Sequence, residues 1–470
     1  YKRQGMDCVA AEYQTVLWDK YHLLYLDGAY GWDQFDENKV SSRVMDYVAG
    51  NLSETGENSV FRTKLCEASL LEYMFATDND GTGMLRQASA YMKRHLPEDV
   101  AKKMYQQYQD GKKAEADGKT EYSVEDADQA IINAKKEKEQ ADQNDKEGAP
   151  QEEAGEKNIQ DNENNHAQDA EDSKKESPIQ IVLQLKQNAL LGMTVSDMSS
   201  LSAKAVEAKD MVSNRQCETG RYDMKKAEKM NVSDRVMVLE YIGKHFSDYT
   251  EPGKGDLTYE MEYILCGKDT DKKNLESSIE RLMRMREAAN VAHIIADREK
   301  LNQTLMIATS LAGFSGNPAV VKIVQIGVVA AWAYVESILD LRTLLSGGKI
   351  SLIKSAAEWT TDLKKLGEIV TGEGKARECK NGLSYQAYIK QLLFAMKEKK
   401  MAYRMMDIME LAMQKEQNGK NARMDHMIDN MICELRFEAK PLFAKRSLYG
   451  DMEMGGYTFF KRQKLSYINE

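Results

Sequence analysis

The sequence has few of the residues that build recognisable metal or redox sites. The six cysteines are scattered and include no CxxC pair: Cys8, Cys66, Cys217, Cys266, Cys379 and Cys433. The six histidines form no HExxH or HxxxH pattern: His22, His95, His166, His245, His293 and His426. Zinc ribbons, iron–sulfur centres, thioredoxin-like chemistry and metal catalysis therefore lack support. We predict no metal site, no cofactor and no catalytic residue.

A hydrophobic run long enough to cross a membrane is also missing. The thirteen residues Ile323 to Val335 are uncharged, between Lys322 and Glu336. At about 1.5 Å per residue a helix of this run spans about 20 Å, against a hydrocarbon core of about 30 Å. A helix that is apolar on all sides must be surrounded by protein, so we predict a buried central helix.

Excess positive charge is missing as well. The chain has 65 Lys+Arg against 75 Asp+Glu, a net charge of −10, which argues against nucleic acid as a partner. The segment from Lys135 to Pro178 alone carries −7 and has one large apolar residue, Ile159. Such a segment cannot offset its ordering entropy, so we predict that it is disordered. The preceding residues, Val124 to Gln140, have the composition of a helix.

Helical periodicity dominates the remaining chain. We expect an amphipathic helix from Gln4 to Leu24 at the N-terminal end, and a strand from Ala68 to Ala76. The run Ile179 to Leu191 fits either a helix or a strand. Further helices are predicted at Ser42 to Ala49, Met84 to Gln107, Asp234 to His245, Asn274 to Lys300, Leu301 to Phe314 and Pro318 to Leu345.

The C-terminal region changes to a period of two, which is typical of strands. Met431, Cys433, Leu435 and Phe437 alternate with more polar residues, and residues 457–467 follow the same parity. We predict two antiparallel strands here. The fold class is therefore α+β and predominantly α-helical, with central buried helices. We divide the chain into residues 1–117, a helical extension and insert at 118–178, and residues 179–470, which form one body with 1–117.

Three short motifs resemble functional sites but fail on inspection. Asp78-Asn79-Asp80-Gly81 resembles part of a calcium loop, yet the flanking ligand positions are Ala76 and Gln87, so a simple turn is predicted. Residues 346–349 lack the earlier glycine and the following Ser/Thr of a phosphate loop, and are interpreted as a helix end. Residues 314–316 are flanked by helices and do not form a nucleophile elbow.

Methionine is abundant, with 27 residues. Five lie on one stripe of a predicted helix: Met401, Met405, Met406, Met409 and Met413. Flexible thioethers can form a docking surface, but they more often fill a core, which we predict here. His293 is predicted as a hydrogen-bonded core histidine.

A resemblance extends over most of the chain outside the insert. Four segments carry it: residues 23–31 (LLYLDGAYG), 72–81 (EYMFATDNDG), 259–269 (YEMEYILCGKD) and the block 312–350. They are similar to a family of uncharacterised exported proteins of clostridial gut bacteria, which look like pseudopilin-type proteins of tight-adherence (Tad) pilus-like systems. The resemblance implies an extracellular part that follows an N-terminal apolar helix. It implies no catalytic residue.

Three functions are consistent with these observations. The first is a non-enzymatic, extracellular or cell-surface structural protein. Its partners would be other surface or pilus-like proteins, and an apolar segment ahead of Tyr1 would anchor it in the membrane. The second is an enzyme, such as a hydrolase, whose site is assembled from residues distant in sequence. The third is a cytosolic helical scaffold that binds partners through its Met-rich helix.

Overall fold

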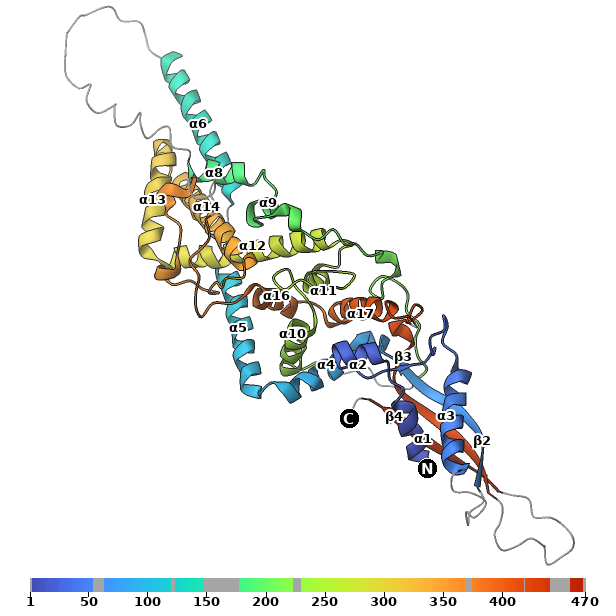
Figure 1. The fold of residues 1–470 in the computed structure, drawn as a ribbon. Coiled ribbons are helices and arrows are strands. Elements are labelled where there is room, and N and C mark those ends of the chain that lie inside the picture. The colour runs from blue at the N-terminus through green and yellow to red at the C-terminus, as the bar shows by residue number, and fades with distance from the viewer. Residues whose placement is uncertain are drawn as a thin grey trace, which may run out of the picture. The chain divides into compact units, whose positions relative to one another are not determined.

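The computed structural model describes residues 2–53, 63–119, 123–147, 177–222, 230–367, 374–417, 419–439 and 457–467. Helices predominate, and the strands form one antiparallel sheet. The predicted α+β, mainly α-helical fold is therefore confirmed (Figure 1). Contacts within the chain define two compact units. Unit 1 contains residues 1–105, 202–274 and 392–470, and unit 2 contains residues 106–201 and 275–391.

The sheet of unit 1 is built around β3 (Met427–Ala439). Along one edge β3 pairs with β2 (Thr63–Phe75), and along the other with β1 (Leu26–Asp27) and β4 (Tyr457–Ser466). All of these pairs are antiparallel, and Phe437 lies opposite Phe459. The strand predicted at residues 68–76 and the two strands predicted in the C-terminal region are therefore confirmed.

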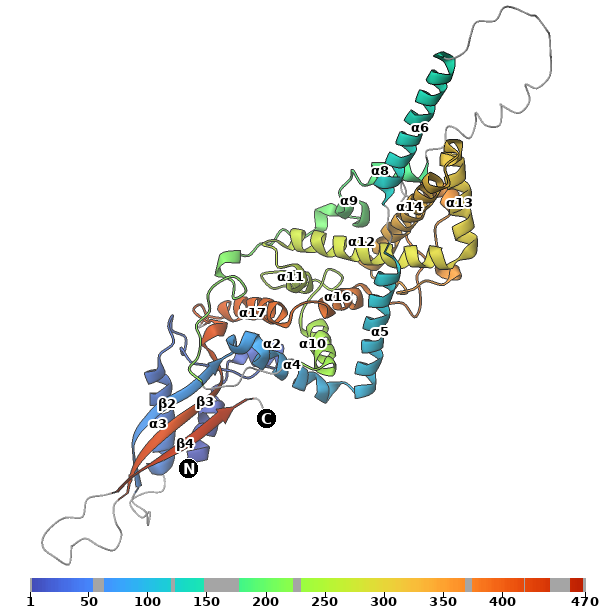
Figure 2. The same cartoon turned by 180° about the vertical axis from the view of Figure 1, so that it is seen from behind.

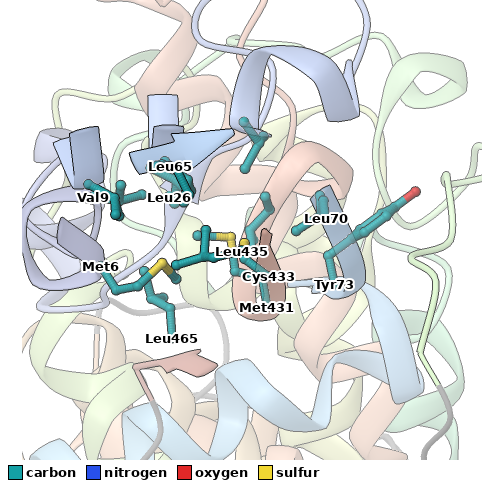
Figure 3. Packing of buried hydrophobic residues seen from close by; sticks show 14 of the residues in the cluster. Met6, Val9, Leu26, Leu65, Leu70, Tyr73, Met431, Cys433, Leu435 and Leu465 are labelled. Carbon is teal, nitrogen blue, oxygen red and sulfur yellow. The ribbon is translucent and has the colours of Figure 1, made fainter. Parts of the chain in front are cut away.

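Two helices, α1 (Lys2–Ala10) and α3 (Glu37–Ser53), cover one face of this sheet (Figure 1). Met6 and Val9 of α1 pack against Leu435 and Leu465 and their neighbours in one buried cluster (Figure 3). The alternation in β3 explains this cluster, because every second side chain points toward the helices and is buried. The opposite face carries exposed charged side chains (Figure 2 gives the view from behind).

The rest of unit 1 is helical. It contains α2 (Thr15–Tyr21), α4 (Thr82–His95), α10 (Val232–His245), α11 (Glu260–Cys266) and α17 (Glu398–Gln414). Helix α17 contacts α2, α4 and α11. The five methionines of its stripe are all fully buried, which confirms their predicted place in the core.

Unit 2 is organised around α14 (Pro318–Leu345), which contacts α6 (Val124–Glu147), α8 (Pro178–Leu185), α9 (Leu190–Thr194) and α13 (Arg298–Ala312). Ala331 and Val335 have no exposed surface, as predicted for a buried central helix. Pro318 occupies the first turn of α14, and Gly316 before it adopts φ +63°. The expectation that no apolar segment is long enough to cross a membrane is wrong, because α14 has the length and composition to do so, but 61% of its most apolar window is buried in protein. The central helix of a soluble core has these same properties.

Several predicted boundaries are wrong. The N-terminal helix does not run from Gln4 to Leu24, because the chain leaves the helix after Ala10 and Tyr13 bridges to Leu26. The helix predicted from Met84 to Gln107 is divided into α4 and α5 (Glu98–Asp117) at Pro97, which cannot donate a backbone hydrogen bond.

Four further predictions differ from the structure in smaller ways. Helix α12 (Asp271–Ala296) ends before Lys300, because the side chain of Asp297 caps α13. The run Ile179 to Leu191 contains no strand; it falls in α8 and α9. Helix α16 (Tyr385–Phe394) was not predicted. Helix α6 continues to Glu147, so the segment predicted to be disordered is helical from Lys135 to Glu147. Residues 148–176 of that segment lie outside the described residues.

Candidate functional site

The most unusual backbone in unit 1 is the turn between β2 and α4. Asn79, Asp80 and Gly81 follow one another with φ values of 50°, 59° and 75°. Left-handed conformations are unfavourable for residues with a Cβ, although Asn and Asp tolerate them best. A Cβ on Gly81 would lie 2.8 Å from the Cβ of Ala402, so this position requires glycine. Strain of this kind is common at functional sites.

Asp78 holds this turn in place. Its Oδ2 accepts hydrogen bonds from the backbone N–H of Phe75 at 2.7 Å and of Gly220 at 3.0 Å. Burial raises the pKa of the Asp78 carboxyl, and the two N–H groups oppose that shift. The turn predicted at residues 78–81 is therefore confirmed. Within the described ranges, no three His, Cys, Asp or Glu residues are placed to hold a metal ion.

The turn forms one wall of a pocket with a volume of about 970 Å³, which we call the turn pocket. A second wall is Thr219 and Tyr222, and a third is Arg235 in the first turn of α10. The remaining wall is the segment 394–399 with Tyr403, where α17 begins. The N-cap residue of α17, Lys397, makes no side-chain hydrogen bond to the first turn of that helix.

Two polar groups of the turn pocket have no hydrogen-bond partner. They are the buried Oγ1 of Thr77, a residue that is 3% exposed, and the buried Nε of Arg235. The other Arg235 nitrogens contact Glu398 Oε1 at 3.2 Å and the carbonyl oxygen of Met396. Burial lowers the pKa of Arg235, an effect that Glu398 only partly offsets. Buried polar groups usually have partners, but neither of these two atoms has exposed surface that faces the pocket.

The same walls offer little for covalent chemistry. No His, Cys or Ser is among the described residues that line the turn pocket. Burial raises the pKa of Tyr222 and raises that of Tyr403 to about 12, so both phenols are neutral hydrogen-bonding groups near pH 7. The hydroxyl of Tyr403 donates to the carbonyl oxygen of Thr77 at 2.9 Å. The arrangement suits recognition of a polar ligand better than nucleophilic catalysis.

A different set of buried charges lies in unit 2. Arg286, Glu336, Asp340 and Lys354 have side chains with no exposed surface. Asp340 contacts Arg286 Nε at 3.0 Å and Lys354 Nζ at 2.5 Å, and Lys354 also contacts Glu336. Glu336 further accepts the backbone N–H groups of Thr360 and Thr361. Two positive and two negative charges therefore compensate each other, and we call them the α14 network.

Unit 1 contains a comparable ion-pair cluster. Arg215 contacts Glu410 at 2.5 Å and Asp425 at 2.7 Å, and Arg423 also binds Asp425. The hydrogen bonds and charge of Arg423 and Arg215, with the N–H of Glu218, lower the pKa of Asp425 although burial opposes this. These contacts join the loop around Arg215 to the end of α17 and the start of β3, which is a structural role.

Of the candidate residues that the sequence analysis discussed, only those of the turn at residues 78–81 line the turn pocket. His293 stacks on Trp359 at 4.8 Å between ring centroids, and burial lowers its pKa. None of the six cysteines is in a disulfide. Sequence reasoning missed Arg235 and Thr77, which carry no local motif. It also missed the α14 network, although Glu336 and Asp340 are spaced four apart on an apolar helix, a signal that was available.

The outer face of the sheet, away from α1 and α3, is open and charged. Arg436 pairs with Glu67 at 3.2 Å and Arg462 with Glu434 at 3.0 Å. Phe460 of β4, opposite Arg436 on this face, is 56% exposed. Within the described part of the chain, the edge of β4 opposite β3 pairs with no strand.

Comparison with known proteins gives one match. The chain belongs to a family of unknown function (DUF5702), whose model matches residues 168–439. This family match agrees with the resemblance to uncharacterised proteins that the sequence analysis describes. No curated protein and no solved structure matches the chain.

Proposed function

We propose that this protein is a non-enzymatic structural protein of the cell surface, a pseudopilin-like component that acts by assembly. The observation that carries the proposal is the sheet of unit 1, which has a helix-covered face, an open face and an edge at β4 that pairs with no strand among the described residues. Edge strands are templates for pairing with another chain. The resemblance to exported pilus-associated proteins supports the location and a membrane anchor in the full-length protein.

The charges of the two sheet edges favour head-to-tail contact between copies of the chain. The exposed residues Lys461, Arg462 and Lys464 make β4 basic. Two β4 edges would therefore repel each other, whereas β2 carries Lys64, Glu67 and Glu72 and has a net charge of −1. Residues 64–69 of β2 pair with no strand other than β3 in the described chain. A contact between unlike edges repeats from copy to copy, and it produces a filament when the rotation between copies does not close a ring.

The alternative of a scaffold that docks partners through the Met-rich helix has less support. All five methionines of the stripe are buried within unit 1, so they offer no surface to a partner. An enzyme is also less well supported, because the turn pocket lacks a nucleophile and base pair among its described residues.

Charge reversal tests the assembly. We expect sedimentation velocity to show self-association that increases with protein concentration. Lys464→Glu and Glu67→Lys should each weaken it by about tenfold, because like charges then meet at the edge. The double variant should recover association, since the two edges are again complementary. Lys119→Glu, at an exposed lysine of unit 2, is the control.

A monomer at every concentration would contradict the proposal. So would single reversals that associate as well as the unmodified chain. Melting temperatures of all variants should be compared, since Glu67 also pairs with Arg436 within the sheet.

A further inference from the structure

Three helix C-termini meet in unit 1, and each of them carries a histidine. His22 is the C-cap residue of α2, His95 is the last residue of α4 and His245 is the last residue of α10. The three imidazoles surround the ring of Tyr91. Their centroids lie 4.8 Å (His22), 4.2 Å (His95) and 5.4 Å (His245) from that of the tyrosine. A positive charge on one of these histidines therefore acts on the other two.

Helix α10 holds the end of α2 through two hydrogen bonds. The hydroxyl of Tyr241 donates to the carbonyl oxygen of Tyr21 at 2.6 Å, and Nδ1 of His245 lies 2.9 Å from the carbonyl oxygen of Lys20. The last carbonyl groups of a helix have no partner within the helix, so these two bonds satisfy the end of α2. Because a carbonyl oxygen only accepts, Nδ1 of His245 must carry the proton and Nε2 must be unprotonated.

Nε2 of His245 is poorly placed to take up a second proton. The atom is buried and has no hydrogen-bond partner among the described residues, so an added N–H would lack an acceptor. Burial lowers the pKa of His245 to about 4, and the neighbouring His22, Lys244 and His95 add to this effect, although the bond to the carbonyl group of Lys20 opposes it. Protonation of His245 is therefore unfavourable while α2 and α10 remain in contact.

The cavity beside His245 does not neutralise such a charge. It has a volume of about 420 Å³, and Glu260 and Asp256 line it. Asp256 pairs with Lys415 at 3.0 Å. Glu260 accepts the backbone N–H of Ser247 at 2.9 Å, and burial raises the pKa of Glu260, so this carboxylate loses its own charge in acid. Two further lysines also line the cavity, Lys20 and Lys254.

We propose that the contact between α2 and α10 is a pH-sensitive device, which holds α2 in place near neutral pH and releases it when His245 becomes protonated. The charged ring reaches water and an acceptor for its second N–H only if the contact loosens. Release would free residues 15–21, which connect α1 on the sheet to the helical part of unit 1. The device goes beyond the assembly proposed above and does not depend on it.

The direction of the effect follows from proton linkage. The ordinary pKa of the imidazole is 6.5, so the closed contact binds this proton less tightly than the open or unfolded chain does. The stability that the contact contributes is fully present above about pH 6.5 and is lost as the pH falls toward about 4. Because the ring is partly exposed, we expect less than the full shift would give, namely an increase of at least about tenfold in the opening equilibrium.

Urea denaturation of the whole chain between about pH 7 and pH 4 tests this proposal. His245→Asn keeps an N–H donor for the carbonyl group of Lys20 but has no ring to protonate. The unfolding constant of the unmodified chain, divided by that of this variant, should rise by at least about tenfold over this range. Tyr241→Phe is the matched control, because it removes the neighbouring hydrogen bond without a titrating imidazole. Its effect on stability should be the same at every pH.

Two further measurements on the unmodified chain locate the change. Nitrogen NMR of the histidine side chains should show His245 with the proton on Nδ1, and still neutral at about pH 5. Its signals are assigned by their loss in His245→Asn or, if that variant does not fold, through contacts with the ring of Tyr241. Hydrogen exchange, corrected for intrinsic rates, should show that amides of α2 lose protection in acid before those of α14.

Three results would overturn the proposal. One is that His245 is protonated near pH 6 in the folded chain. Another is that the unmodified chain and His245→Asn lose stability in parallel as the pH falls. The third is that α2 keeps its protection in acid until the whole chain unfolds. These outcomes are separate from those of the edge reversals, because Lys464 and Glu67 lie on the sheet.

Discussion

The α14 network and the turn pocket both contain ion pairs, but they differ in how far water reaches those pairs. In the network, Asp340 lies between Arg286 and Lys354, and each charge has an opposite partner with no exposed surface. In the pocket, Arg235 pairs with Glu398 at 3.2 Å and Lys399 with Asp80 at 2.8 Å, and all four side chains are partly exposed. Ion pairs without exposed surface fix one arrangement of the fold, whereas partly exposed pairs beside a cavity are screened by water and contribute less to stability.

The largest effect should follow from opening the α14 network. Asp340→Ala leaves Arg286 and Lys354 buried with too few negative partners, and we expect a loss of about 3–5 kcal/mol of stability. Chemical denaturation measures the loss. Glu299→Ala, at an exposed residue of unit 2, should change stability by less than about 0.5 kcal/mol. Similar denaturation midpoints for Asp340→Ala and Glu299→Ala would mean that water reaches the charges of the α14 network.

A new charge in the same helix should act almost as strongly. Ala331 has no exposed surface, so Ala331→Asp introduces a carboxylate without a partner and should cost several kcal/mol. Ala319→Asp is the matched control, because Ala319 is exposed in the first turn of α14, where an acidic side chain is favourable. An unchanged melting temperature for Ala331→Asp would place α14 at the surface and revive the membrane interpretation.

An apolar cavity in unit 1 should have a somewhat smaller effect. Met405 is fully buried on α17, and Met405→Ala should cost about 2–5 kcal/mol. Met405→Leu conserves volume and should cost less than about 1.5 kcal/mol. Thermal melting distinguishes the two, and an equal, small effect of both would indicate that the stripe is not core in solution.

The last effect depends on pH. Asp429 is 1% exposed, and burial raises the pKa of its carboxyl to about 7, although Gln87 donates to it at 3.1 Å. The folded state thus holds the proton more tightly than the unfolded state. Asp429 therefore lowers stability as pH rises from about 4 to about 7, by a few kcal/mol at about 1.4 kcal/mol per pKa unit.

Asp429→Asn should remove this pH dependence. The stability of the variant relative to the unmodified chain should increase between pH 4 and 7 and stay level above pH 7. Denaturation midpoints at several pH values check the sign. A relative stability that falls over this range would show that Asp429 is ionised and partnered in the folded state.

Sequence periodicity predicted the elements whose burial is regular. Buried and exposed residues alternate in β3, and α14 is apolar on all sides, so local pattern and tertiary packing agree. The break after Ala10 could not be predicted in this way. Residues 11–14 contain neither Pro nor Gly, and the chain turns there because Tyr13 bridges to Leu26 and Gln14 caps α2.

The turn pocket was predictable only in part. Residues 78–81 contain the turn signal, and Asn79 and Asp80 are among the residues that adopt positive φ most easily. The position of Arg235 opposite Asp78 depends on how α10 packs on α4, more than 140 residues away in sequence. No local pattern encodes such a contact, so sequence alone gave no site.

Fractionation of cells that make the full-length protein tests the central claim most directly. The proposed surface role predicts that the protein is recovered with the membrane or with surface filaments. It also predicts that protease added to intact cells releases or degrades it. Recovery of the full-length protein wholly in the cytosol, protected from that protease, would contradict the account.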